Sequence, residues 1–294
     1  MTIYIPLPGN EAMAFELAKI TSSELGTLEH RRFPDEETYV RLTSDVSGKA
    51  VELVCTLARP DPQLPGLLFA AYTARELGAT SVGLIAPYLA YMRQDKRFSD
   101  GESVSSGHFA RLLSGAFDRV VTVDPHLHRI HDLNDVFSIN TKVVHAAPAL
   151  SDWIKAHVDK PLIIGPDAES EQWVSDVADR ASAPHLVLSK VRHGDRNVEV
   201  TAPGLKNWTG HQPVLVDDIA SSGRTMMEAA RHFETAGFAK PVCVIVHPLF
   251  AGNAYEDLKS VSTRVVSTNA VQHASNEISI TEVVLFSCTV FRPC

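Results

Sequence analysis

The chain has 294 residues, of which 45% are hydrophobic and 21% are charged, so it is long enough for two domains with their own cores. Its net charge of −8 argues against a nucleic acid or an anionic membrane surface as a partner, and any basic site must be local. No apolar run approaches the length that spans a bilayer, and the first residues lack the basic flank of a signal peptide. The four cysteines show no metal-type spacing, and so few cysteines in so long a chain predict a reducing, cytoplasmic location.

Apolar, β-branched runs alternate with helical patterns along the whole chain. In the first half, strands are expected at 2–7, 38–42, 50–56, 81–85 and 119–123, and helices at 11–25, 64–77 and about 106–117. In the second half, strands are expected at 161–164, 185–188, 213–216, 241–246 and 264–267, and helices at 148–157, 169–180, 224–236, 254–259 and from 281. This alternation predicts an α/β fold with a largely parallel central sheet, flanked by helices, in each half.

The domain boundary is expected near 140–147, which gives domains of 1–143 and 144–294. The last helix is free to pack on the N-terminal domain. Segments 121–124 and 214–217 resemble each other, as do 83–87 and 162–166. Either an internal repeat or the general likeness of buried strands would explain this similarity, and the sequence does not decide between them.

The most informative stretch is 213–225, where a buried strand is followed by two acids, a turn of small residues and a helix. The residues concerned are Asp217, Asp218, Ser221, Ser222, Gly223, Arg224 and Thr225. Free N–H groups at a helix start bind phosphate, and the serine and threonine hydroxyls add donors. The two acids suit ribose hydroxyls, or a metal shared with a second phosphate. The alternative is an ordinary strand–turn–helix with an acidic rim, but five side-chain types at set spacing favour the binding site.

This stretch resembles the phosphoribosyl-pyrophosphate (PRPP) binding motif of type I phosphoribosyltransferases and PRPP synthetases. Two positions depart from that motif. Ser221 stands where many members have an acid, so no general base is assigned there. Arg224 stands where many have a second glycine, and it adds a cation beside the expected phosphate.

Taken together with this stretch, nearly the whole chain, from residue 3 to about 284, resembles the ribose-phosphate pyrophosphokinases, which are the PRPP synthetases. The matching segments are 33–37 (Phe-Pro-Asp-Glu-Glu), 88–95, 124–126, 165–167 and 190–192. The resemblance implies two phosphoribosyltransferase-like domains, a nucleotide side in the first and a ribose 5-phosphate side in the second. It also implies transfer of a diphosphoryl group from Mg-ATP to ribose 5-phosphate, with Mg²⁺ as the cofactor.

For ATP, the resemblance implies contacts from Arg93, Gln94 and Asp95 in one subunit. It also implies contacts from Phe33, Asp35 and Glu37 of a neighbouring subunit, so we expect a homodimer or a larger homo-oligomer. The residue chemistry agrees with this, because an amide matches the adenine edge and a guanidinium stacks on a ring or grips phosphate. A solvated charged loop is the alternative for the Arg-Gln-Asp run taken alone.

For the metal, the resemblance implies His126 and Asp167. Magnesium prefers oxygen ligands, so the histidine is a poor direct ligand; the sequence leaves open whether it contacts the metal directly or through water. For catalysis it implies Lys190 and Arg192, cations that stabilise charge on the transferring group. A solvated loop is again the alternative.

Two other functions stay open from the sequence. One is a phosphoribosyltransferase, which would consume PRPP and attach a base. The other is a catalytically silent homologue that regulates an active synthetase, although the lysine, arginine and paired acids that catalysis needs are present.

Overall fold

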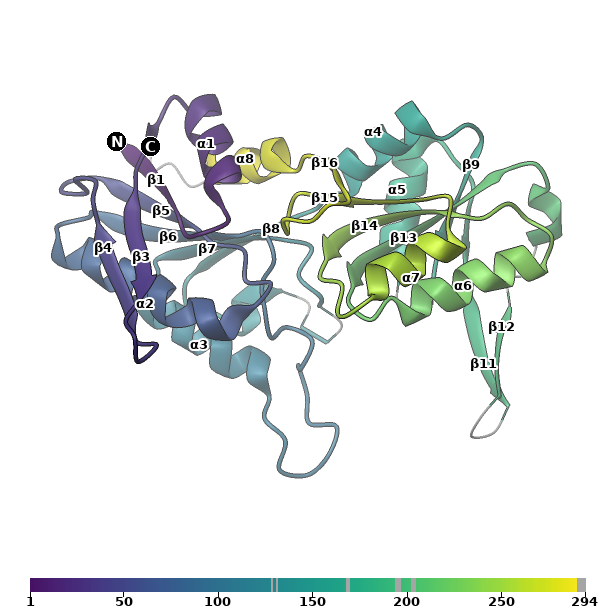
Figure 1. Cartoon of the computed structure of the whole chain (residues 1–294), viewed down its shortest axis with the longest axis horizontal. Helices are drawn as coiled ribbons and strands as arrows, with labels where there is room; N and C mark the ends of the chain where they lie inside the picture. Colours follow the sequence, from purple (N-terminus) through teal and green to yellow (C-terminus); the bar gives the residue numbers. More distant parts are fainter. Residues whose placement is uncertain (128, 131, 168–169, 194–196, 202–204, 290–294) are drawn as a thin grey trace. The chain divides into compact units, whose positions relative to one another are not determined.

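The computed structural model describes residues 1–127, 129–130, 132–167, 170–193, 197–201 and 205–289, and it divides the chain into two compact units (Figure 1). The first unit comprises Met1–Val144 and the segment from Thr281 onward, and the second comprises His145–Ile280. The segment from Thr281 forms α8 (Thr281–Thr289), which packs on α1, β7 and β8 of the first unit. The expected domain limits of 1–143 and 144–294 are not tested by this division and remain a prediction.

The N-terminal unit is built on a parallel sheet with the strand order β2-β1-β5-β6-β7-β8. Its strands are β1 (Thr2–Pro6), β2 (Glu24–Leu25), β5 (Ala50–Val54), β6 (Ser81–Ala86), β7 (Arg119–Val123) and β8 (Asn140–Val144). Helices α1 (Glu11–Ile20), α2 (Pro60–Glu76) and α3 (Ser105–Ala116) flank it, with a short 3-10 turn at Leu133–Asp135. The central strands are buried on both faces because helices cover the sheet, which explains their continuous apolar runs.

The C-terminal unit is built on a second parallel sheet with the order β10-β9-β13-β14-β15-β16. Its strands are β9 (Pro161–Gly165), β10 (His185–Val187), β13 (Gln212–Ala220), β14 (Val242–Pro248), β15 (Arg264–Thr268) and β16 (Asn276–Ile278). The helices are α4 (Ala147–His157), α5 (Glu171–Ala181), α6 (Arg224–Thr235) and α7 (Ala254–Val261), with a 3-10 turn at Leu205–Trp208. Met226, Ala230 and Phe233 of α6 pack with Leu215, Ile245 and Leu258 in a buried core.

The two units share one topology. Numbered within its own unit, each sheet has the order 2-1-3-4-5-6, and each has an antiparallel hairpin inserted between its second and third strands. These hairpins are β3 (Leu28–Arg32) with β4 (Thr38–Leu42), and β11 (Ser189–His193) with β12 (Asn197–Thr201). The echoing segments 121–124 and 214–217 lie on β7 and β13, which are not equivalent strands. The repeat therefore exists in the topology, whereas that sequence echo reflects the general likeness of buried strands.

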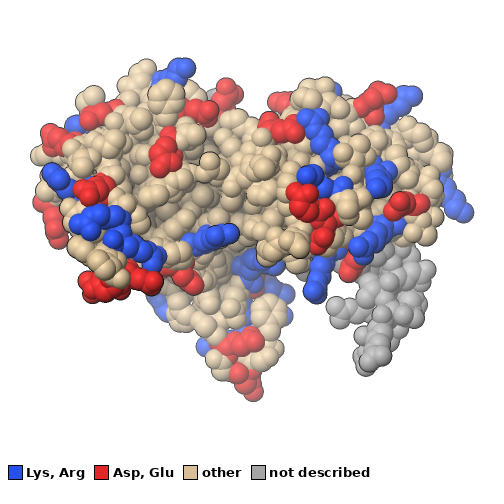
Figure 2. Space-filling view, in the orientation of Figure 1, with Lys and Arg blue, Asp and Glu red and all other residues tan. Residues whose placement is uncertain are grey.

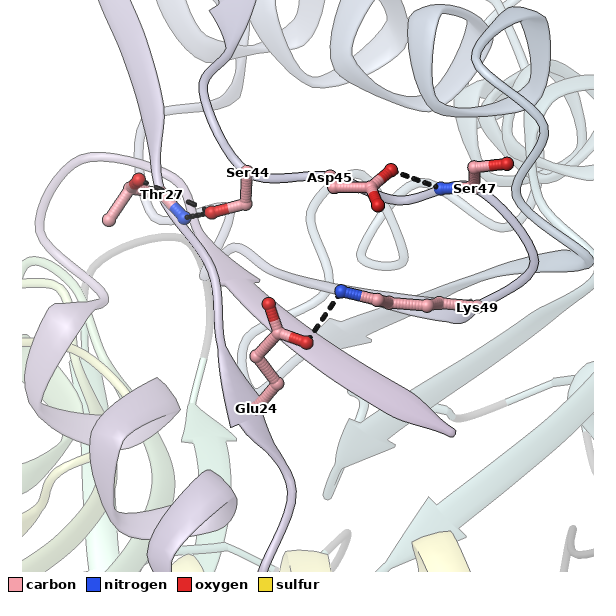
Figure 3. Close-up of polar contacts among 6 residues, drawn as sticks. All are labelled: Glu24, Thr27, Ser44, Asp45, Ser47 and Lys49. Atoms are coloured by element: carbon pink, nitrogen blue, oxygen red, sulfur yellow. Dashed lines mark hydrogen bonds and ion pairs between the residues drawn. The ribbon is translucent and has the colours of Figure 1, made fainter.

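Polar contacts close the base of the β3–β4 hairpin and join the two sheet strands that flank it (Figure 3). The Ser44 hydroxyl accepts from the Thr27 N–H at 2.9 Å. The Thr27 and Thr43 hydroxyls lie 2.7 Å apart. An ion pair of 2.6 Å between Lys49 Nζ and Glu24 Oε2 joins the start of β5 to the short edge strand β2. The hairpin also packs on α2, where the His30 ring occupies the space that a side chain at Gly66 would need.

A buried ion pair crosses the middle of the N-terminal sheet. Glu52 of β5 pairs with Arg119 of β7, and the two side chains meet over Gly83 of β6, which lies between them in register. A Cβ at position 83 would lie 2.9 Å from Arg119 Nε and 3.0 Å from Glu52 Cδ. The glycine is therefore required here for space rather than for its backbone freedom.

The structure corrects several expected elements. The first helix ends at Ile20 rather than 25, because the Thr21 hydroxyl bonds back to the Leu17 carbonyl and Ser22 turns the chain at φ 51°. The expected boundary segment 140–147 contains β8, an edge strand, and β16 is a second short edge strand that the pattern did not show. The loop expected from 189 contains β11, and β13 continues through both acids to Ala220.

Candidate active site

Two backbone carbonyls of the turn between β13 and α6 are bonded to a segment that is distant in the sequence. The Phe250 N–H donates to the Ala220 carbonyl and the Ala251 N–H to the Ser221 carbonyl, each at 2.9 Å. Because a trans peptide is planar, each carbonyl points opposite to the N–H that follows it. The N–H groups of Ser221 and Ser222 therefore point away from the 250–251 segment, into the turn. Sequence reasoning missed the role of this segment, since its contacts are backbone bonds between distant residues.

Gly223 completes the turn at the N-terminus of α6. It has a φ of 67°, a left-handed conformation that favours glycine, and a Cβ there would contact Ala254. Since glycine has no side chain to cap the helix, the first N–H groups of α6 are left for a ligand. Arg224 and Ser222 are exposed, whereas Ser221 and Thr225 are half-buried. All five predicted phosphate-site residues thus lie in one turn and the first residues of one helix.

Three aspartates gather where β9 ends beside the last part of β13. Asp217 and Asp218 belong to β13, and Asp167 follows Gly165 at the end of β9, the neighbouring strand. Burial raises the pKa of Asp217 well above its ordinary value, and the negative charges of Asp218 and Asp167 raise it further. This point is also where the strand order of the sheet reverses, which is where open α/β sheets bind their ligands.

The acids do not form a closed metal cage. Within the described residues, no group of three or more His, Cys, Asp or Glu is placed to hold a metal ion by itself. The oxygen donors around Asp217 nevertheless fit Mg²⁺, which keeps several waters and shares its coordination with substrate phosphates. His126 belongs to the other unit, where it follows β7 and is half-buried.

The predicted nucleotide segment follows β6 in the N-terminal unit. Arg93 is exposed and Gln94 is half-buried, and the Ser105 hydroxyl lies 3.5 Å from Gln94 Oε1. His126 follows β7, the neighbouring strand, so both segments lie beyond the carboxyl edge of the same sheet. The Asp95 carboxylate, by contrast, is engaged with Arg129. Sequence reasoning missed that partner, which lies 34 positions away in the chain.

The predicted loop 33–37 is the tip of the β3–β4 hairpin. Phe33 is 40% exposed and Asp35 and Glu37 are exposed, so this tip presents its side chains to solvent. The Arg31 guanidinium lies 4.6 Å from the Phe33 ring centroid and 4.1 Å from that of Tyr39. Sequence reasoning also missed Arg31 and Tyr39, which hold the Phe33 ring at the tip.

The predicted catalytic cations lie on a hairpin rather than in a loop. Lys190 and Arg192 belong to β11 and pair with Val200 and Val198 of β12. Figure 1 shows this ribbon extending away from the C-terminal sheet. The side chains of both residues lie outside the part of the chain that the structure describes.

Charge is mixed over the visible surface of each unit. Figure 2 shows basic side chains interspersed with acidic ones on the face in view. Among the described residues, no helix is both long and apolar enough to cross a membrane.

Comparison with known proteins agrees with this arrangement. A family model described as the N-terminal domain of ribose phosphate pyrophosphokinase matches residues 3–116, and one described as a phosphoribosyl transferase domain matches 139–281. The ribose-phosphate pyrophosphokinase of Saccharolobus solfataricus is 33% identical over 268 residues, which cover 89% of this chain and 90% of that protein. The one of Methanothermobacter thermautotrophicus is 31% identical over 277 residues, covering 94% and 95%.

A solved structure shares the fold. The crystal structure of phosphoribosylpyrophosphate synthetase from Mycobacterium smegmatis superposes with a TM-score of 0.84 over 98% of each chain, at 21% identity. The predicted fold class, two α/β domains with parallel central sheets flanked by helices, is confirmed.

Proposed function

Because this chain belongs to the ribose-phosphate pyrophosphokinase family, we propose that it transfers the diphosphoryl group of ATP to the 1-hydroxyl of ribose 5-phosphate. The products are AMP and 5-phosphoribosyl 1-diphosphate, a precursor for nucleotide biosynthesis. The observation that carries the proposal is the structure of the turn after β13. Backbone N–H groups point into this turn, and three aspartates lie beside it.

Ribose 5-phosphate binds at this turn. Its phosphate accepts hydrogen bonds from the N–H groups of 221–225 and from the Ser222 and Thr225 hydroxyls, and Arg224 adds a positive charge. Its ring hydroxyls donate to Asp217 and Asp218, which lie in β13 a few residues before the turn. The phosphate, which accepts hydrogen bonds, therefore faces donors, and the ring hydroxyls, which donate them, face carboxylate acceptors.

The nucleotide binds beyond the carboxyl edge of the N-terminal sheet. Arg93 grips the triphosphate or stacks on the base, and Gln94 offers a donor and an acceptor to the adenine edge. Phe33, Asp35 and Glu37 come from the hairpin of a second subunit, and we therefore propose a homodimer or a larger assembly. The exposure of this hairpin tip supports that part of the proposal.

In the transfer, the 1-hydroxyl oxygen of ribose 5-phosphate attacks the β-phosphorus of ATP in line. The bond between that phosphorus and the oxygen bridging to AMP breaks, and the hydroxyl proton leaves to solvent, since we assign no protein base. Lys190 and Arg192 balance the charge on the transferring group. Asp167, and separately His126 through water, would help to place Mg²⁺, which when bound neutralises phosphate charge.

We also propose the cytoplasm as the enzyme's compartment. Cys55 and Cys243 are buried free thiols, and burial raises the pKa of each to about 12. Both are thus core residues, as a reducing environment allows.

The test is to incubate the protein with ATP, Mg²⁺ and ribose 5-phosphate and to follow the phosphorus species by ³¹P NMR. We expect AMP and 5-phosphoribosyl 1-diphosphate in equal amounts. If the protein instead releases diphosphate from added PRPP when a nucleobase is supplied, it is a phosphoribosyltransferase. Tight nucleotide binding without turnover would make it a catalytically silent homologue.

A further inference from the structure

Asp95 is enclosed by the protein in a way that its neighbours Arg93 and Gln94 are not. Its side chain is 3% exposed. Its Oδ1 atom accepts from Arg129 Nη1 at 3.0 Å, and its Oδ2 atom accepts from the Arg129 backbone N–H at 3.2 Å. Both carboxylate oxygens therefore already have a donor, and one of these bonds is charge-assisted.

A nucleotide gains little from such a carboxylate. So small an exposed surface leaves no room for a base or a ribose to reach the oxygens. The negative charge of Asp95 would also repel the phosphates of ATP if its partner did not neutralise it. The remaining effect of Asp95 is on the segments that it connects.

The contact connects two segments that follow neighbouring strands. Arg93 and Gln94 immediately precede Asp95 in the segment after β6, and Arg129 lies three residues beyond His126 in the segment after β7. The Arg129 guanidinium also lies 6.0 Å from the centroid of the Phe98 ring, so it contacts the segment after β6 a second time. A single arginine thus fixes the position of one segment against the other.

We infer that Asp95 is a positioning residue: its pair with Arg129 holds the Arg93–Gln94 segment against the segment that carries His126. The inference rests on the proposed function in that it takes this region to be the ATP side of the site. It revises the role that the family resemblance implies for Asp95, and it assigns a role to Arg129.

The test is a double-mutant cycle with Asp95→Asn, Arg129→Gln and the double variant. We expect each single change to raise the KM for ATP by about five- to twentyfold, with the KM for ribose 5-phosphate within twofold of wild type. The double variant should resemble the single variants, because the second change removes a partner of a contact that is already lost. Arg129→Lys, which keeps the charge, should restore part of the affinity.

A second ion pair of the same unit provides the control. Arg75 Nη2 and Asp118 Oδ1 lie 2.8 Å apart at the other end of the sheet. Arg75→Gln should lower the thermal stability and leave the KM for ATP unchanged, which separates general destabilisation from positioning. Melting curves of all variants show whether each one folds, and the Arg129→Lys variant keeps the inference testable if Arg129→Gln does not.

Two results would overturn the inference. One is an Arg129→Gln enzyme whose KM for ATP stays within twofold of wild type while that of Asp95→Asn rises. The other is a double variant whose effect is the product of the single effects, since either result means that Asp95 contacts the nucleotide itself. If the wild-type protein does not form AMP, the proposed function fails, and calorimetric binding of a non-hydrolysable ATP analogue to the same variants still decides the role of Asp95.

Discussion

Gly83→Ala should destabilise the N-terminal unit although it adds only one methyl group. The new carbon would lie 2.9 Å from Arg119 Nε and 3.0 Å from Glu52 Cδ, and closer still to Glu52 Oε2. Ordinary contacts between such atoms are about 3.5–4.0 Å, so the carboxylate oxygen must retreat by roughly 1.5–2 Å and Arg119 Nε by roughly 0.5–1 Å. The Glu52 side chain is only 6% exposed and that of Arg119 is 18% exposed, so the carboxylate has little solvent-filled space to move into. Breaking a buried pair costs about 3–5 kcal/mol, and because this pair is displaced rather than removed we expect about 3 kcal/mol.

Differential scanning calorimetry measures this effect directly. For a unit of this size, about 3 kcal/mol corresponds to a loss of roughly 6–12 °C in the Tm of its transition. Gly115→Ala is the matched control, since a Cβ at this α3 position meets no atom within 4 Å and should leave the Tm unchanged or slightly higher. In a Glu52→Ala background the same glycine change should cost less, because the nearer of the two obstructing groups, the carboxylate, is gone. A Tm within about 2 °C of wild type, or an equal loss in both backgrounds, would refute the steric argument.

Three further predictions concern the site and its surroundings. Gly223→Ala should raise the KM for ribose 5-phosphate by about tenfold over that for ATP, because a left-handed residue other than glycine costs about 1–2 kcal/mol at the phosphate turn; equal changes in both KM values would contradict this. Lys190→Ala should lower kcat by about 10²–10³-fold with little change in the KM for ribose 5-phosphate, and an unchanged kcat would remove Lys190 from the mechanism. His30 should make the N-terminal unit acid-sensitive, because burial and the nearby Arg32 lower its pKa below 6.5. The unfolded chain then takes up a proton first, so stability is present above about pH 6.5 and is lost as the pH falls through the lowered folded-state pKa. Melting curves at pH 8 and pH 5.5 should therefore converge in a His30→Gln variant, and an identical pH dependence in both proteins would count against the argument.

The parts of the fold that depend on local pattern could be predicted from the sequence. The alternation of buried strands and helices and the strand–turn–helix around Gly223 follow from runs of adjacent residues, and the structure has them. Short edge strands such as β8 and β16 could not be predicted, because they are only partly buried and so lack a continuous apolar run.

The contacts that organise the site depend on tertiary structure instead. The bond from the Phe250 N–H to the Ala220 carbonyl joins two backbone groups, so it requires no particular side chain that a sequence pattern could reveal. Arg129 is 34 positions from Asp95 in the chain, so no local pattern links the two. Asp95 stands beside Arg93 and Gln94 in a polar run, so sequence reasoning gave all three one role. Only the burial of its carboxylate sets Asp95 apart.

The placement of α8 has a consequence for synthesis of the chain. This helix belongs to the unit that emerges first from the ribosome, where the Thr281 hydroxyl donates to Glu16 Oε2 at 2.5 Å, yet it is made after the whole second unit. The first unit is therefore complete only after a segment that follows the second unit has been translated. Nonsense mutations just before the codon for Thr281 would accordingly weaken the N-terminal unit, although every residue of its sheet had been synthesised.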